Sequence, residues 1–373
     1  MSVRVVTLPR GADAATFAAR AKAHGADALE VRDDLTETAE PGPLPLLLAH
    51  RGGQGFGVRG QWEDRAGGEI ASVHFERPLT PEEAERHWAG CTARYLKHVE
   101  PLGDPTSGAR LLETQARLVA RFGEGRVTVL ATGDCALPWR AILARRNAFD
   151  YLALDATTAS APGQRLMADA VRAGDAPGPR LAIIGHQIAH ARSPRLHAQP
   201  FDRWDLPPDA PVRELVDALR DHYRGFAITA PFKRAFGDDA VNTLVRRPTG
   251  WATYNTDVDG ARAVVKRHGA RDFTVLGDGG AAWALRRAGA RAVLKAAEVT
   301  RVSGDVFWTW PAHVSAPAAL RLDGARVFVI AYGAPATRIA GRIRVLGGTP
   351  VRAGHTWFIA QARAQRRLWW EAS

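Results

Sequence analysis

Residues 70–99 read IASVHFERPLTPEEAERHWAGCTARYLKHV and contain, in succession, a strand, a helix and a second strand. The short stretches 70–76 and 93–99 are rich in apolar and β-branched residues, which is typical of strands. Between them, residues 81–89 carry apolar side chains at helical spacing. Two strands joined through a helix predict a parallel β–α–β unit.

The same alternation extends on both sides of this segment, from residue 3 to residue 156. Seven strands can be distinguished, and no fourth strand or helix can be recognised between Arg51 and His74. The barrel either closes with an atypical element or stays open. The other predicted strands lie near 3–8, 26–32, 44–51, 126–131 and 151–155, and the other predicted helices span Ala14 to His24 and Ser107 to Phe122.

Alternation within the strands separates a polar face from an apolar one. Leu29 and Val31 lie opposite Glu30 and Arg32, and His74 shares a face with Ser72. In a barrel the apolar set meets the outer helices, and polar residues near the carboxyl ends of the strands gather in the mouth. We therefore expect Glu30, Arg32, His74 and Lys97 to converge there. The alternative is a hydrogen-bonded core histidine and a surface ion pair between Glu30 and Arg32.

Lysine is scarce in this chain. Of its 50 basic residues only five are lysines, at positions 22, 97, 233, 266 and 295. Arginine replaces lysine where surface charge suffices, but it cannot lose a proton or attack a carbonyl. Three of the five occupy helical stretches where a surface role suffices: Lys22, Lys266 and Lys295. Lys97 and Lys233 are the candidates for chemistry.

Composition excludes several classes of protein. The 46% hydrophobic and 24% charged residues predict a globular protein, and the net charge of +11 is dispersed along the chain. We therefore expect no nucleic-acid partner. No apolar run approaches the ~20 residues that cross a bilayer, so we expect no membrane association. Two cysteines and an N-terminus without a signal-like apolar core favour the cytoplasm, and we expect no metal site.

A Gly- and Pro-rich stretch at 171–180 (VRAGDAPGPR) marks a domain boundary, and a new strand begins at Leu181. Further along, Val275-Leu-Gly277-Asp278-Gly279-Gly280-Ala281 follows a strand and opens a helix, a context suited to holding a pyrophosphate on backbone amides. The alternative is a tight strand–helix turn without a cofactor. We predict an α/β protein with three domains: a shortened barrel (1–174), an α/β substrate domain (181–260) and a Rossmann-like nucleotide domain (261–373) whose last helix returns to the substrate domain.

The first half resembles the type I 3-dehydroquinate dehydratases. The motifs that carry the resemblance are Glu30-Val-Arg32-Asp-Asp34, Arg51, Ser72-Val-His74-Phe75, Leu79-Thr80-Pro81, Tyr95-Leu-Lys97, the loop Gly133 to Arg140, and Ser160-Ala-Pro-Gly-Gln164. The resemblance implies that Lys97 forms an imine with the substrate ketone while His74, oriented by Glu30, moves protons. It implies that the substrate is bound by Arg32, Arg51, Arg140, Ser160 and Gln164, and that this half needs no cofactor.

The amine must lose its proton before it attacks a ketone, and we expect cations such as Arg32 or Arg140 beside Lys97 to favour the neutral form. Two positions depart from the family's pattern. A glutamate that follows the family's Arg51 equivalent is Gly55, and the serine before its late arginine is Trp139.

The second half resembles the shikimate dehydrogenases. The motifs are His190-Ala-Arg-Ser193-Pro194, Gly225-Phe-Ala-Ile-Thr229-Ala-Pro231-Phe-Lys233, Ala240-Val-Asn242-Thr-Leu244, Asn255-Thr-Asp257, Tyr332 with Pro335 and Thr337, and Gly354 with Gln361. The resemblance implies that Lys233 and Asp257 flank the reacting hydroxyl. It implies substrate contacts from Ser193, Thr229, Asn242, Tyr332 and Gln361, and NADP contacts from Gly277, Gly279, Gly280, Ala281 and Arg301.

Departures from this second pattern remove substrate hydrogen bonds, since Ala191 replaces a serine and Ala227 an asparagine. In the family an N-R-T motif that favours NADP ends the strand after the glycine turn. Here Arg301 is the available arginine, and it lies out of register.

The order of the two halves resembles the fused dehydratase–dehydrogenase of the shikimate pathway. That resemblance implies conversion of 3-dehydroquinate to 3-dehydroshikimate, then reduction to shikimate with NADPH, all of them small anionic cyclic substrates. The alternatives are a non-catalytic paralogue that binds shikimate-type ligands, and a protein in which one half alone is active.

Overall fold

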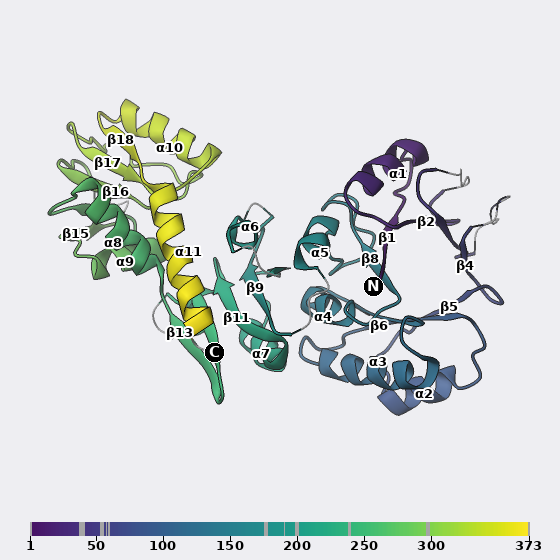
Figure 1. Ribbon diagram of the computed structural model, residues 1–373. Helices are drawn as coiled ribbons and strands as arrows, with labels where there is room; N and C mark the ends of the chain where they lie inside the picture. The colour runs from purple at the N-terminus through teal and green to yellow at the C-terminus, as the bar shows by residue number, and fades with distance from the viewer. Residues whose placement is uncertain are drawn as a thin grey trace. The chain divides into compact units, whose positions relative to one another are not determined.

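The computed structural model describes residues 2–36, 42–52, 56, 58, 60–174, 178–189, 191–197, 201–237, 240–295 and 299–371. Two compact units divide the chain: Met1–Pro194 with Ala198–Arg224, and Arg195–His197 with Gly225–Ser373 (Figure 1). The three-domain division drawn from the sequence remains a prediction.

The first unit is built on an eight-stranded parallel sheet in the order β7-β6-β5-β4-β3-β2-β1-β8. Its two ends meet where the amide of Ala148 donates to the carbonyl of Val127 over 2.8 Å, so the sheet is nearly closed into a barrel. The strands are β1 (Val3–Thr7), β2 (Ala28–Arg32), β3 (Leu46–Ala49), β4 (Trp62–Asp64), β5 (Ile70–His74), β6 (Tyr95–Pro101), β7 (Val127–Thr132) and β8 (Phe149–Leu152).

Strand β4 corrects the prediction of seven strands. It pairs with β3 through Leu47 and Trp62, and it is followed by a turn at 65–69 that leads directly into β5. Its three residues, WED, carry neither the length nor the apolar alternation by which strands are recognised. The seven predicted strands are confirmed to within a few residues.

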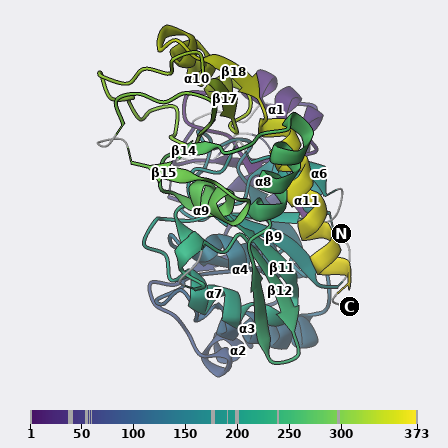
Figure 2. The ribbon, with the colours of Figure 1, turned by 90° about the vertical axis from the view of Figure 1, so that its left-hand side faces the viewer.

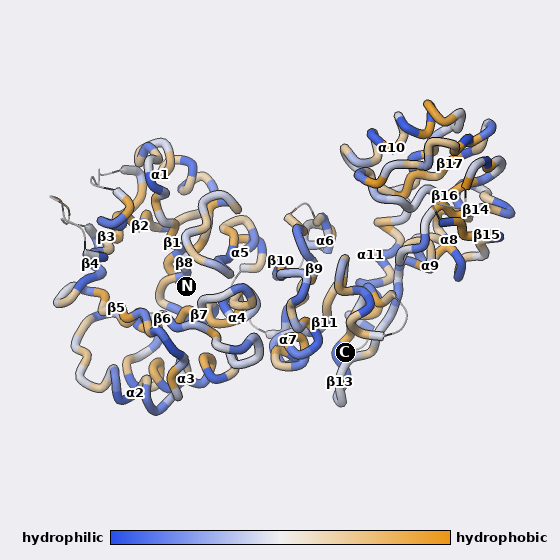
Figure 3. Tube along the Cα trace, turned by 180° about the vertical axis from the view of Figure 1, so that it is seen from behind, coloured by the Kyte–Doolittle hydropathy of each residue, from blue (hydrophilic) through white to orange (hydrophobic). Residues whose placement is uncertain are grey.

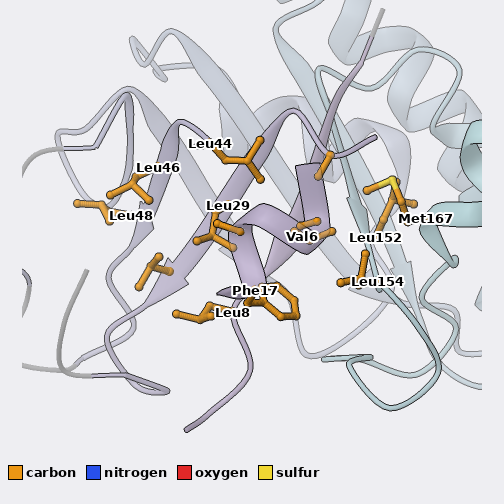
Figure 4. Packing of buried hydrophobic residues seen from close by; sticks show 14 of the residues in the cluster. Val6, Leu8, Phe17, Leu29, Leu44, Leu46, Leu48, Leu152, Leu154 and Met167 are labelled. Carbon is orange, nitrogen blue, oxygen red and sulfur yellow. The ribbon is translucent and has the colours of Figure 1, made fainter. Parts of the chain in front are cut away.

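Five helices cover the barrel: α1 (Ala14–Ala23), α2 (Pro81–Trp88), α3 (Gly108–Phe122), α4 (Ala136–Leu143) and α5 (Met167–Ala173). Helix α1 begins where the Asp13 carboxylate accepts the amide of Thr16, and α2 begins at a capping box between Thr80 and Glu83. Phe17 of α1 packs on the outer face of the sheet near Leu8 and Leu154 (Figure 4). The predicted outward face is thereby confirmed for Leu29 and Val31.

The inner face of the barrel changes character along the strands. At one end Val5, Ala28, Ile70 and Phe149 fill the interior with apolar side chains. Further along β2 and β6, toward their carboxyl ends, the same face carries buried charged residues. The mouth of the barrel is therefore the polar end, as in (β/α) barrels generally.

The rest of the first unit adds two parallel strands and short helices to the barrel. Strand β9 begins at Arg180, one residue before the predicted start at Leu181. The elements are β9 (Arg180–Gly185), β10 (Phe201–Asp205), α6 (Ser193–Leu196), α7 (Val212–Ala218) and the 3-10 helix η1 (Arg220–His222).

The second unit contains an antiparallel set and a five-stranded parallel sheet in the order β15-β14-β16-β17-β18. Figure 2 labels β14, β15, β17 and β18 of the parallel sheet. The inner strands of this sheet, β14, β16 and β17, are hydrophobic over most of their length, as expected when helices cover both faces (Figure 3). The elements are β11 (Tyr223–Ile228), η2 (Phe232–Arg234), β12 (Thr243–Arg247), β13 (Gly250–Tyr254), α8 (Asp257–His268), β14 (Thr274–Leu276), α9 (Gly280–Arg287), β15 (Ala292–Leu294), β16 (Asp305–Trp308), β17 (Arg326–Val329), α10 (Ala334–Val345), β18 (Thr349–Arg352) and α11 (Gly354–Glu371).

Helix α11 extends from the parallel sheet to β12. The indole of Trp369 donates to the carbonyl of Leu244 over 2.9 Å, and the amide of Gln365 donates to the carbonyl of Asn242 over 3.1 Å. No helix among the described residues is both long and apolar enough to cross a bilayer.

Candidate active sites

Lys97 lies inside the barrel, on the polar part of its inner face. Its Nζ is 3.5 Å from Oε1 of Glu30 on β2 and 3.4 Å from Oδ2 of Asp64 on β4, and 5% of its side chain is exposed. Glu30 also accepts a hydrogen bond of 2.6 Å from the hydroxyl of Thr7 on β1. The barrel thus brings Glu30 and Lys97 together, as the sequence predicts.

Asp64 is the residue of this group that the sequence did not reveal. It is fully buried on β4, and its Oδ2 joins Lys97 to Arg51, whose Nη2 lies 2.5 Å away. The other carboxylate oxygen, Oδ1, has no hydrogen-bond partner. Because β4 was not recognised, no pattern in the sequence marked Asp64 as inward-facing.

Tyr151 on β8 completes the cluster. Its ring lies over the Lys97 ammonium, with 3.9 Å between Nζ and the ring centroid. Burial, then the carboxylates of Glu30 and Asp64, raise the pKa of the phenol well above its ordinary value. The phenol is therefore neutral at pH 7.

His74 ends β5 at the mouth and is exposed as a residue. Partial burial of the ring, followed by the charges of Lys97 and Arg51, lowers its pKa to about 4. The imidazole is therefore neutral at pH 7 and able to accept a proton. The contacts of Glu30 are with Lys97 and Thr7, so its predicted role in orienting His74 has no support in the hydrogen bonds of the described residues.

The predicted cationic neighbours of Lys97 are replaced by carboxylates. Arg32 forms a two-bond ion pair with Asp34, over 3.0 and 2.7 Å. Arg140 lies buried on α4, where Nη2 donates to the backbone carbonyl of Tyr151 over 3.1 Å. Because this residue belongs to a helix rather than to a loop at the mouth, the fold does not bring Arg140 to the amine.

The predicted closing loop packs against the start of α4. Gln164 accepts hydrogen bonds from the amide and hydroxyl of Ser160, over 2.8 and 3.2 Å. A Cβ on Gly163 would meet the carbonyl of Gly133 at 2.7 Å, so glycine is required for this contact. Ser160 and Gln164 therefore contact each other. Gly55, the departure noted from the sequence, lies outside the described residues.

In the second unit Lys233 and Asp257 form the pair expected from the sequence. The Nζ of Lys233, on η2, is 2.6 Å from Oδ2 of Asp257, the first residue of α8. The indole of Trp357 donates to the other oxygen of Asp257 over 3.2 Å and fixes the orientation of this carboxylate. Trp357 had no signal in the sequence pattern. One quarter of the Lys233 side chain (25%) is exposed, so the amine is reachable from solvent.

Asn242 and Gln361 meet beside this pair. The Asn242 amide donates to Oε1 of Gln361 over 3.3 Å, and its carbonyl oxygen accepts the amide of Thr256 over 2.8 Å. Thr229 is half-buried at the end of β11. Tyr332 packs against Phe358 with 5.3 Å between ring centroids, and Ser193 is buried at the start of α6.

The glycine-rich turn adjoins Lys233. A Cβ on Gly280 would lie 3.5 Å from Cδ and 3.8 Å from Nζ of Lys233, whereas a Cβ on Gly279 would meet only open space. Gly277 has φ +121°, a conformation that favours glycine. Helix α9 begins at Gly280 and Ala281 follows it, so free backbone amides face a cavity of about 190 Å³. This cavity is lined by Gly279, Gly280, Asp278, Arg234 and Arg286 among others. The two arginines were not predicted, and they balance the negative charge of Asp278 beside the expected phosphates.

Arg301 does not stand at the turn. Its side chain is 76% exposed and pairs with Asp323 over 2.7 Å. The strand after the glycine turn is β15, which ends at Leu294, so Lys295 occupies the position where the sequence analysis sought Arg301. The expectation that Lys295 belongs to a helix is wrong, because the residue directly follows this strand.

Comparison with known proteins identifies relatives of this chain. No family model matches it. A shikimate dehydrogenase (NADP(+)) of Acidiphilium cryptum (strain JF-5) is 34% identical over 173 residues, covering 37% of this chain and 63% of the relative. One of Anaeromyxobacter sp. (strain Fw109-5) is 32% identical over 136 residues, covering 29% and 49%.

The chain is similar to shikimate dehydrogenases. It spans about half to two thirds of the length of these two relatives. A solved structure of the dehydroquinate dehydratase and shikimate dehydrogenase of S. pombe AroM aligns with 99% of this chain and 95% of its own, at 18% identity and a TM-score of 0.37.

Proposed function

We propose that the second unit is a shikimate dehydrogenase, which reduces 3-dehydroshikimate to shikimate with NADPH. The observation that carries this proposal is the Lys233–Asp257 pair at 2.6 Å beside the glycine-rich turn. An ammonium positioned by a carboxylate, itself fixed by an indole, is a suitable proton donor to a ketone oxygen. The similarity to shikimate dehydrogenases supports the choice of substrate.

In this reaction Lys233 donates a proton to the carbonyl oxygen while that oxygen becomes a hydroxyl, and Asp257 holds the ammonium in place. Asn242 and Gln361 offer amide groups to the ring hydroxyls; Ser193, Thr229 and Tyr332 are further contacts that we propose from the resemblance. The loss of hydrogen-bonding side chains at Ala191 and Ala227 predicts weaker substrate binding than in enzymes that keep them.

The turn fits a dinucleotide. Gly279 leaves open space where a side chain would stand, and the free amides at the start of α9 face the cavity with Arg234 and Arg286. We propose that Gly277, Gly279, Gly280 and Ala281 hold the pyrophosphate and that Lys295 faces the additional phosphate. NADPH, when bound, supplies the hydride.

The test is hydride transfer by the whole chain. Purified protein mixed with shikimate and NADP should produce the absorbance of reduced nicotinamide, and titration should show NADPH binding. Absence of both turnover and binding of either nicotinamide would overturn the proposal. Binding of NADPH and shikimate without turnover would instead support a non-catalytic ligand-binding protein.

We further propose that the barrel dehydrates 3-dehydroquinate through an imine at Lys97. The amine adds to the ketone, and water leaves as the iminium forms. Neutral His74 then removes the adjacent proton, the ring hydroxyl departs as water, and hydrolysis of the imine returns Lys97. The buried carboxylates of Glu30 and Asp64, 3.5 and 3.4 Å from the ammonium, are placed to take the proton that the amine must lose.

Imine formation is tested by trapping. Borohydride added with 3-dehydroquinate should leave a mass adduct on Lys97 that is absent in Lys97→Arg and present in Lys22→Arg, since Lys22 is exposed on α1. An adduct equally abundant in Lys97→Arg, or no adduct in the wild type, would contradict this activity and leave the dehydrogenase proposal standing alone.

Both cysteines, Cys91 and Cys135, are free thiols, which fits the cytoplasm that we propose as the compartment.

A further inference from the structure

A small cavity lies in the first unit, where the barrel meets β9. Its volume is about 20 Å³, and the charged side chains that line it are Arg4, Arg145, Arg165, Arg180 and Asp150. Four guanidinium groups and one carboxylate therefore surround a space of nearly atomic size. The charged side chains that line this cavity are therefore mostly cationic.

The ion pairs of these arginines do not neutralise all of their positive charge. Arg165 donates to Asp150 over 3.0 Å, and Arg180 donates to Asp202 over 3.2 Å and to the carbonyl of Gly174 over 2.7 Å. The side chains of Arg165, Arg180 and Asp202 are almost fully buried. Even with Asp202 counted beside Asp150, four guanidinium groups face two carboxylates, an excess of two positive charges.

Several donors at this cavity have no hydrogen-bond partner. They are Nε and Nη2 of Arg145 and Nε of Arg180, and all three atoms are buried. Arg180 itself is 3% exposed. A buried donor without a partner is costly, and a buried charge without compensation is more so. The cavity therefore offers unused donors as well as uncompensated charge.

The pKa values of two arginines at this cavity shift in opposite directions. Burial opposes the charge of Arg165, but the carboxylates of Asp150 and Asp202 outweigh it and raise the pKa of this residue. Burial, and next the charge of Arg180, lowers the pKa of Arg145 from its ordinary value. Burial lowers the pKa of Arg140, on the preceding helix α4, to about 10. A pKa of about 10 keeps Arg140 charged at pH 7.

We propose that this cavity is a binding site for one monatomic monovalent anion of the size of chloride, held by Arg145, Arg165 and Arg180. A cavity of about 20 Å³ accommodates a single water-sized particle, since ~10–15 Å³ is the minimum for one. The volume matches one monatomic ion. Water would satisfy the free N–H groups but would leave the charge uncompensated, whereas a halide satisfies both.

Such an anion would connect three segments of the first unit. Arg145 directly follows α4, Arg165 precedes α5, and Arg180 opens β9. The bound ion would therefore stabilise the attachment of β9 to the barrel, and its effect would appear in folding stability. This inference does not depend on the proposed enzymatic activities.

Bromide provides the direct test. Crystals of the whole chain grown in sodium bromide should show an anomalous-scattering peak between the guanidinium groups of Arg145, Arg165 and Arg180. Density without anomalous signal at this position would identify a water molecule and overturn the proposal.

Thermal unfolding gives a second test in solution. At constant ionic strength, replacing gluconate by chloride should raise Tm along a saturating curve. Arg145→Gln should abolish the rise, whereas Arg146→Gln, which removes an exposed neighbouring arginine paired with Glu124, should preserve it. A Tm that is indifferent to chloride, or a rise that survives in Arg145→Gln, would contradict the site. If Arg145→Gln does not fold, the wild-type bromide and chloride measurements still decide.

Discussion

Lys97 in the barrel and Lys233 in the second unit are both held by carboxylates, but in opposite surroundings. Lys97 has 5% of its side chain exposed, two carboxylates at 3.4–3.5 Å and a tyrosine ring over its amine. Lys233 has 25% exposed, one carboxylate at 2.6 Å and a glycine turn beside it. Lys97 therefore belongs to a buried network of charges, and Lys233 to an ion pair that solvent can reach.

The two lysine sites therefore differ in how strongly the folding of the protein depends on them. Charges that are buried together depend on one another, so removing one leaves its partners uncompensated. The contact between Lys233 and Asp257 can break when a substrate binds and form again afterwards, without unfolding of the protein. The barrel can perform imine chemistry only if its carboxylates release the amine, whereas the second unit needs no such rearrangement.

The largest expected effect in folding stability is at Asp64. Asp64→Asn removes the negative charge shared by half-buried Arg51 and buried Lys97, and leaves Glu30 as the one carboxylate beside the Lys97 amine among the described residues. We expect the free energy of unfolding to fall by about 3–5 kcal/mol, measured by urea denaturation. The matched variant Asp259→Asn, at an exposed position on α8, should change it by less than about 0.5 kcal/mol. A loss below about 1 kcal/mol at Asp64 would show that the barrel network is not mutually dependent.

The next effect compares two histidines with depressed pKa values. Burial lowers the pKa of His197 to about 4, against an ordinary value of 6.5. Between pH 6.5 and 4 the unfolded chain therefore binds more protons than the native one. The stability that neutral His197 contributes is complete above pH 6.5 and is lost as the pH falls toward 4, by at most about 3 kcal/mol.

Replacing each histidine by glutamine isolates its share. His197→Gln should flatten the dependence of unfolding free energy on pH between 6.5 and 4. His74→Gln should change it in the same direction but less, because His74 is exposed and solvent screens its neighbours. Equal slopes for wild type and His197→Gln would contradict the buried neutral imidazole.

A smaller effect concerns the glycine turn. Gly279 has φ −78° and open space at its Cβ position, so Gly279→Ala costs the free protein almost nothing. A methyl group there would occupy the space we assign to the pyrophosphate. We expect Kd for NADPH to rise about tenfold, roughly 1.4 kcal/mol, with Tm unchanged. Unaltered NADPH affinity would place the dinucleotide elsewhere.

The smallest effect distinguishes two cations near β15. Lys295→Gln should weaken NADPH by about fivefold while leaving NADH unchanged, as expected for one lost phosphate contact of about 1 kcal/mol. Arg301→Gln should alter neither, because Arg301 is exposed and paired with Asp323. Both affinities are measured by fluorescence titration. If Arg301→Gln weakens NADPH binding and Lys295→Gln does not, the additional phosphate contacts Arg301, as the sequence analysis expected.

The sequence predicted the regular parts of the fold and two pairs of residues that the structure brings together. Apolar alternation identified the strands that carry Glu30 and Lys97, and motif order placed Lys233 beside Asp257. The same signals failed where structure is short or polar. Strand β4 has three residues, WED, so it was not recognised and Asp64 was missed. Strand β15 (Ala292–Leu294) is equally short, so the sequence did not show that Lys295 follows a strand.

Arg140 shows a second limit of sequence reasoning. Its position in a motif suggested the mouth of the barrel, but the chain forms α4 there and directs the guanidinium to the backbone of Tyr151. Contacts such as that of Trp357 with Asp257 join residues 100 positions apart, and no local pattern reveals them.

The central claim is that the accessible lysine donates the proton during reduction. The most direct measurement is the single-turnover rate of NADPH oxidation by 3-dehydroshikimate, compared between wild type and Lys233→Met, with exposed Lys266→Met as control. The account predicts a fall of about 10²- to 10⁴-fold in Lys233→Met, unchanged NADPH affinity and no effect of the control. A Lys233→Met protein that binds NADPH and reduces substrate at the wild-type rate would contradict it.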